Sequence, residues 1–147
     1  MTKDEVKSYL YNNIPLAKAM DVEVIDISKD SLTLKAPLSS NCNMHGTAFG
    51  GSLSSIALLT GWSHIHTRLD GEWLTKGELV IAEANVIFSR PVDTDLVSRA
   101  YITPENFNEF VENYKLKGKA KVEVDIEVLT DNGPGCRMKG IYALIQS

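Results

Sequence analysis

The sequence has few cysteines and no excess of positive charge. Cys42 and Cys136 are far apart in the 147 residues, so they form neither a CxxC zinc motif nor the dense framework of a small secreted domain. Fifteen basic and nineteen acidic side chains give a formal net charge of −4. This balance disfavours nucleic acid as a partner, since no overall positive field draws in a polyanion. We expect both cysteines to be reduced.

Long hydrophobic runs are also missing. No apolar stretch approaches the roughly eighteen residues of a membrane-spanning helix, and residues 1–10 lack the pattern of a signal peptide. With 44% hydrophobic and 23% charged residues, the composition is that of a globular protein rather than a disordered or fibrous one. We expect one cytoplasmic domain over residues 1–147, with no membrane partner.

Hydrophobic periodicity predicts the elements that are present. Apolar residues that alternate along the chain predict strands, and apolar residues at helical spacing or in long apolar segments predict helices. The expected strands cover residues 20–27, 32–36, 80–88, 96–102, 120–128 and 136–145, and the expected helices cover residues 2–13, 48–69 and 103–114. Asn12-Asn13 before Pro15 is expected to end the first helix.

The second helix is apolar nearly all round in its first half, which is typical of a buried helix. We therefore predict an α+β fold in which one antiparallel sheet of about six strands curls round a long central helix. Such a sheet has open edges, and pairing of the edges of two copies would remove one edge from each copy. A homodimer is the expected assembly.

Two glycines, Gly50 and Gly51, stand where the central helix begins. Glycine costs a helix about 1 kcal/mol relative to alanine, so the pair needs a reason. One reason is close approach of a ligand carbonyl to the free amides of the helix start. Tight packing of the helix on the sheet explains the pair equally well, and spacing alone does not separate the two explanations.

The residues around this pair resemble a known motif. Asn43, Gly46 and Phe49-Gly50-Gly51 resemble the Asn-x-x-Gly-x-x-His-Gly-Gly motif of hotdog-fold thioesterases, and Phe88-Ser89-Arg90-Pro91 resembles the strand end that follows it in that superfamily. More narrowly, residues 46–53 with Gly61-Trp62 resemble the putative-thioesterase domain that some bacterial proteins carry behind a GNAT acetyltransferase domain. Nothing in the 147 residues resembles the acetyltransferase part.

The resemblance implies a hotdog fold and an acyl-CoA or acyl-carrier-protein thioester as substrate. It implies dimers, or dimers of dimers, that bind the thioester at the subunit interface and hydrolyse it without a metal or other cofactor. Carried over to this sequence, Asn43 would position the water or the thioester. The amide of Gly50 or Gly51 would polarise the thioester carbonyl.

The sequence departs from the superfamily pattern at two positions. Phe49 replaces the histidine of the motif, and Leu58 stands where many relatives have a catalytic carboxylate. The nearest polar residues of the helix are Ser54, Ser55 and Thr60, and a hydroxyl is not a general base at neutral pH without help. The identity of the base is therefore open.

Two residues are candidates for this base. A histidine titrates near neutrality, so His45 could activate water; alternatively it is a loop residue that hydrogen-bonds to the backbone. Glu83 has apolar neighbours and shares a parity with Asn85 in a strand expected to pass the helix; alternatively it is exposed. A metal site is not expected, because His64 and His66 face different sides of a helix and lack an i+4 ligand.

For substrate binding we name Phe49, Thr60, Asn85 and Arg90 as candidates. The resemblance places the Arg-Pro strand end near the dimer interface, which favours Arg90 for a CoA phosphate. Alternating lysines at positions 115, 117, 119 and 121 either contribute to such a basic patch or keep a strand edge solvated.

Two other functions stay open at this point. A 3-hydroxyacyl-thioester dehydratase needs a histidine and a carboxylate that converge on the substrate, a role that His45 and Glu83 could fill. A non-catalytic acyl-CoA-binding protein needs only Asn43 and the glycines.

Overall fold

The computed structural model describes residues 1–70 and 77–146. Its elements are, in chain order, α1 (Lys3–Asn13), α2 (Pro15–Ala19), β1 (Glu23–Ile27), β2 (Ser31–Ala36), the 3-10 helix η1 (Leu38–Ser40), α3 (Gly50–Arg68), β3 (Gly77–Phe88), β4 (Leu96–Tyr101), α4 (Pro104–Lys117), β5 (Lys119–Thr130) and β6 (Gly133–Gln146). Each predicted strand and helix has a counterpart among them. The first helix ends at Asn13, as predicted. Pro15 then begins a further short helix, because proline suits the first helical position.

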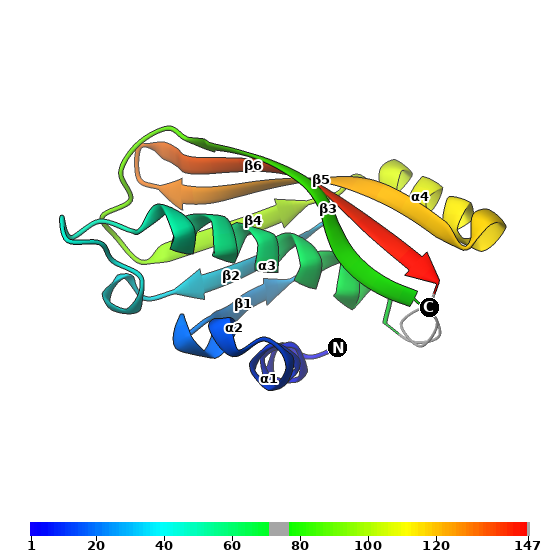
Figure 1. The fold of residues 1–147 in the computed structure, drawn as a ribbon, viewed down its shortest axis with the longest axis horizontal. Coiled ribbons are helices and arrows are strands. Elements are labelled where there is room, and N and C mark those ends of the chain that lie inside the picture. Colours follow the sequence, from blue (N-terminus) through cyan, green and yellow to red (C-terminus); the bar gives the residue numbers. More distant parts are fainter. Residues whose placement is uncertain (71–76, 147) are drawn as a thin grey trace.

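The strands form one antiparallel sheet of six, in the order β1-β2-β4-β5-β6-β3. Figure 1 shows this sheet curving round α3, with α1 and α2 beside β1 and α4 beside the start of β5. The predicted α+β architecture with a long central helix is therefore confirmed. Within the described residues, none of the helices is long and apolar enough to cross a membrane.

The core lies between α3 and the inner face of the sheet. Ile56 and Ile65 of α3 are completely buried, as are Leu34 of β2, Val124 of β5 and Cys136 of β6. The helix is also anchored at its side, because the indole Nε1 of Trp62 donates to the main-chain oxygen of Leu79 at 3.0 Å. These contacts fix where the first turn of α3 lies relative to β3.

The strand β3 lies at an edge of the sheet, and most of its residues are exposed on both faces. Its large exposed apolar side chains are Val80, Ile81, Ile87 and Phe88. An unpaired edge of this length offers a row of free backbone donors and acceptors to another strand. The open edges that the sequence predicts are therefore present, and β3 forms one of them.

Candidate active site

The loop that precedes α3 is folded round the side chain of Asn43. Its Oδ1 atom accepts hydrogen bonds from the main-chain amides of His45 at 2.8 Å and Thr47 at 3.3 Å, while Nδ2 donates to the hydroxyl of Thr47 at 2.9 Å. Gly46 has a φ of 77°, a conformation that side chains rarely adopt. Asn43 therefore holds the loop in shape, and the main chain of His45 is one of the groups it holds.

The first turn of α3 opens at the surface beside this loop. Phe49 is the N-cap residue, and no side chain caps the helix, so the leading amides of Gly50 and Gly51 lack an intrahelical acceptor. Their partial positive charge is the feature that the motif implies for polarising a carbonyl. Gly51 is exposed, so a carbonyl can approach this helix start from solvent.

Two aromatic rings border the helix start. The Phe49 and Phe88 side chains are 57% and 54% exposed, respectively. A Cβ on Gly51 would lie 2.4 Å from Cε2 of Phe49, whereas a Cβ on Gly50 would meet Cε1 of Phe88 at an ordinary 3.7 Å. Close packing therefore explains Gly51 in part. The packing partner is the ring of the N-cap residue Phe49, and not the sheet. The sequence does not mark Phe88 as a site residue, and its place at a strand end is the signal that could have found it.

His45 and Glu83, the two predicted bases, lie in different parts of the molecule. His45 is exposed in the loop before α3. Glu83 pairs with Ile141 on the outer face of the sheet, because a register shift between Ile81 and Glu83 changes the side on which β3 residues emerge. The structure therefore places Glu83 on the exposed side of the strand, the alternative that the sequence left open, and away from α3.

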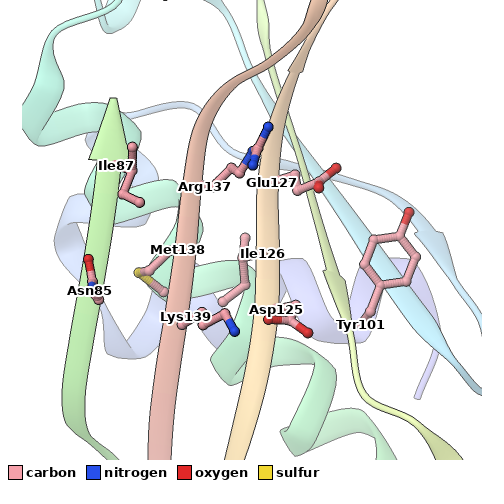
Figure 2. A pocket seen from close by; sticks show the side chains of 9 residues that line it. All are labelled: Asn85, Ile87, Tyr101, Asp125, Ile126, Glu127, Arg137, Met138 and Lys139. Atoms are coloured by element: carbon pink, nitrogen blue, oxygen red, sulfur yellow. The ribbon is translucent and has the colours of Figure 1, made fainter. Parts of the chain in front are cut away.

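Asn85 also lies on the outer face of the sheet, opposite Lys139. It lines a pocket there together with Asp125, Arg137 and other residues of β3, β4, β5 and β6 (Figure 2). Acidic residues of β5 pair with basic residues of β6 in this pocket, so its charges are mixed. The sheet separates this pocket from the start of α3, and the structure does not bring Asn85 to the predicted site.

Thr60 and Arg90 have internal partners. The Thr60 side chain is completely buried, and its hydroxyl donates to the main-chain oxygen of Ile56 and contacts the Ser98 hydroxyl at 2.8 Å. The Arg90 guanidinium donates to the main-chain oxygen of Asn132 in the β5–β6 turn. Thr60 therefore joins α3 to β4, and Arg90 joins the end of β3 to a hairpin.

Burial explains the state of the two helix histidines. Burial and, to a smaller extent, the nearby Arg68 cation lower the pKa of His64 from 6.5 to about 4. Burial also lowers the pKa of His66, whose ring stacks on Trp62 with ring centres 4.4 Å apart. Both imidazoles are therefore neutral at pH 7. They lie in the core near the end of α3, away from its first turn.

Known proteins resemble this chain over nearly its whole length. Residues 3–146 match the model of a family described as "Putative thioesterase (yiiD_Cterm)". A protein of unknown function from Chlorobaculum tepidum has a TM-score of 0.92 at 24% identity, covering 99% of this chain and 94% of its own. A putative thioesterase from Shewanella oneidensis has a TM-score of 0.84 at 24% identity, covering 97% and 96%.

A third structure, a probable thioesterase from Pseudomonas aeruginosa, has a TM-score of 0.86 at 18% identity and covers 100% of this chain and 97% of its own. At these identities the likeness is one of fold. It confirms the predicted hotdog architecture, in which the six-stranded sheet wraps a central helix.

Proposed function

Because the chain belongs to the family described as "Putative thioesterase (yiiD_Cterm)", we propose that it hydrolyses acyl-CoA thioesters at the start of α3. The observation that carries the proposal is the exposed, uncapped first turn with Gly50 and Gly51, beside a loop that Asn43 holds in place. Backbone amides at such a point stabilise negative charge that develops on a carbonyl oxygen.

In the proposed reaction, water attacks the thioester carbonyl carbon and gives its proton to a base. The carbonyl oxygen becomes an oxyanion that accepts hydrogen bonds from the Gly50 and Gly51 amides. When the tetrahedral intermediate collapses, the carbon–sulfur bond breaks and the thiolate leaves as free thiol after protonation. The products are a carboxylic acid and CoA, and no step uses a cofactor.

We assign the base to His45. It lies in the loop next to the helix start, whereas Glu83 lies on the outer face of the sheet. A histidine is suited to take a proton from water near neutral pH. Asn43 is then a positioning residue, because its Oδ1 atom accepts the main-chain N–H of His45 and not a proton of the substrate.

The proposal includes a homodimer that forms through β3. The strand is unpaired at one edge and exposes Val80, Ile81, Ile87 and Phe88. A two-fold axis perpendicular to the sheet would pair β3 with β3 of a second copy in antiparallel fashion and continue the sheet. Phe88 lies next to the start of α3, so such pairing would also place the second copy along one side of the proposed site.

The separation of His45 from Glu83 disfavours the dehydratase. That reaction needs the two groups on one substrate, and here the sheet lies between Glu83 and the helix start. Hydrolysis needs one base and the two amides, and these groups lie at one end of α3.

The test measures thiol release from acyl-CoAs of graded chain length, together with mass analysis of the acyl product. We expect CoA and the free acid in equal amounts. Enoyl-CoA without thiol release would establish the dehydratase, and acyl-CoA binding without any product would establish a binding protein. Either result would overturn the proposal.

A further inference from the structure

Asn41 is a buried polar residue shortly before the start of α3. It follows the 3-10 helix η1 and is 3% exposed. Its Nδ2 atom donates to the main-chain oxygen of Met20 at 3.0 Å and to that of Pro37 at 2.8 Å. Met20 ends α2, and Pro37 directly follows β2. Because both hydrogens of the amide nitrogen are used, one side chain joins two segments that are distant in the sequence.

The main chain of Asn41 holds the residue at which α3 begins. Its carbonyl oxygen accepts a hydrogen bond from the amide of Phe49, the N-cap residue, at 2.8 Å. The preceding amide, that of Ala48, donates to the carbonyl oxygen of Val92 at 2.7 Å. The position of the free amides in the first turn of the helix therefore depends on these two main-chain contacts.

We propose that Asn41 is a positioning residue for thioester hydrolysis at the start of α3. Its side chain fixes the main chain of residue 41, and the carbonyl of residue 41 fixes the N-cap of the helix. The Gly50 and Gly51 amides are then held where the carbonyl oxygen of the substrate can reach both. The inference rests on the proposed function, and it adds a residue that lies outside the motif shared with hotdog-fold thioesterases.

The stabilisation of an oxyanion depends strongly on the position of its donors. Backbone amides act at about 2.7–3.1 Å from the oxyanion, and a misplacement of about 1 Å can lower a rate by about 10². A helix start that moved with its loop would not keep this distance. Val92 contributes only a main-chain carbonyl to the anchoring. Of the two anchors, the one through Asn41 is therefore the one that depends on a side chain.

Asn41 and Asn43 have different tasks. The hydrogen bonds of the Asn43 side chain go to His45 and Thr47, within its own loop, so this residue shapes the loop from inside. The Asn41 side chain reaches the ends of α2 and β2, outside the loop. It therefore attaches the loop to the rest of the domain.

A purely structural role explains the Asn41 amide less well. Its Oδ1 atom is buried and, within residues 1–70 and 77–146, has no hydrogen-bond partner. A buried acceptor without a donor lowers stability, and this loss offsets the gain from the two bonds of Nδ2. Met20, to which the amide bonds, belongs to the hydrophobic core, where an apolar side chain would avoid the loss. Fixing the helix start is what an apolar side chain could not do.

The test compares N41L with S98A, a control that also removes a buried polar group. Leucine is close to asparagine in size but donates no hydrogen bond, so the helix start loses one anchor. Ser98 of β4 accepts from the Thr60 hydroxyl, and S98A therefore affects the same helix away from its start. We expect N41L to lower kcat for thiol release about 10- to 100-fold in folded protein, with KM changed less than about twofold. S98A should keep the wild-type kcat.

N41D adds a readout that depends on pH. Aspartate has the shape of asparagine, but its carboxylate would face two carbonyl oxygens, and burial raises the pKa of such a group. In its protonated form it can donate one hydrogen bond to one of these oxygens. We therefore expect the kcat of N41D, relative to the wild type, to rise as the pH falls below neutral. The same ratio for N41L should stay constant.

Wild-type kcat in folded N41L would overturn the inference. An equal loss of kcat in S98A, or a constant ratio for N41D, would overturn it as well. Failure of the proposed function has a different signature, because the wild type then releases no thiol. In that case amide hydrogen exchange decides the positioning role. The Phe49 amide should exchange faster in N41L than in the wild type, and the Leu69 amide, at the far end of α3, should not. An unchanged rate for Phe49 would reject that role.

Discussion

The Tyr142 hydroxyl donates a 2.8 Å hydrogen bond to the main-chain oxygen of Leu58 and so joins β6 to the middle of α3. Its ring lies against Gly61, where a Cβ atom would approach the Tyr142 hydroxyl to 2.4 Å. This contact fixes how closely the helix lies on the sheet. It therefore also sets where the first turn of α3 meets β3.

Gly61→Ala is predicted to destabilise the fold. Alanine favours a helix by about 1 kcal/mol over glycine, but overpacking of a buried contact costs about 1–3 kcal/mol. We expect a net loss of free energy of unfolding in urea titrations, whereas Ser55→Ala on the partly exposed side of the same helix should change stability little. A Gly61→Ala protein as stable as the wild type would show that the Tyr142 contact is loose.

Thr60→Val tests whether the buried threonine serves structure or substrate. The substitution leaves the Ser98 hydroxyl without its buried partner, which costs about 1–3 kcal/mol. We expect a lower melting temperature and unchanged kcat/KM per folded protein. A raised KM at unchanged stability would return Thr60 to the substrate site.

Asn43 variants separate positioning from chemistry. Asn43→Ala removes both main-chain hydrogen bonds to Oδ1, so we expect it to lower kcat with little loss of melting temperature. Asn43→Asp keeps the acceptor for the His45 amide, so it should recover much of kcat. Equal activity of Asn43→Ala and the wild type would contradict the role of the loop.

The buried His64 predicts a dependence of stability on pH. Its pKa in the folded protein is about 4, against 6.5 unfolded, mainly because burial disfavours the imidazolium. Between these pH values the unfolded chain binds more protons than the folded chain. The free energy of unfolding therefore decreases as the pH falls from 6.5 to 4, and the contribution of neutral His64 is fully present above pH 6.5. The loss in the free energy of unfolding reaches about 3 kcal/mol near pH 4. His64→Leu should flatten this part of the curve in urea titrations at several pH values, whereas His45→Gln, in the exposed loop, should not.

Ile87→Glu tests the β3 interface. In the proposed dimer, with β3 paired over its full length, the side chain at position 87 faces Glu78 of the second copy. A carboxylate at position 87 would therefore repel the Glu78 carboxylate. We expect light scattering to give a dimer for the wild type and a weakened dimer for Ile87→Glu. Leu116→Glu, on an even more exposed apolar residue of α4, should remain dimeric. A monomeric wild type would contradict the interface.

The sequence predicted the fold well because the fold depends on periodicity. Apolar alternation marks β5 and an apolar segment marks α3, and neither pattern depends on distant contacts. The site was harder to predict. Glu83 and Asn85 have the parity opposite to Ala84 and Val86, so they lie on the outer face. The register shift before Glu83 also turns Val80 to the outer face, and a bulge of this kind leaves little trace in the apolar pattern.

Partners distant in the sequence were equally hidden. The sequence suggests Thr60 as a polar residue near the site, but its hydroxyl is hydrogen-bonded to the hydroxyl of Ser98 in β4. Arg90 looked free for a phosphate, but the carbonyl of Asn132 accepts from it. Asn43 and the two glycines do lie together at the start of α3, because a short motif carries local backbone geometry, and their catalytic roles stay a prediction.

The most direct test of hydrolysis at the start of α3 is kcat for thiol release by Gly51→Val, with Thr67→Val near the other end of the helix as the control. Valine at position 51 would displace the Phe49 ring and block the approach of a carbonyl to the amides. The account predicts a loss of about 10²–10³ in kcat for Gly51→Val, with an unchanged circular dichroism spectrum, and wild-type kcat for the control. Wild-type kcat in a folded Gly51→Val protein would contradict it.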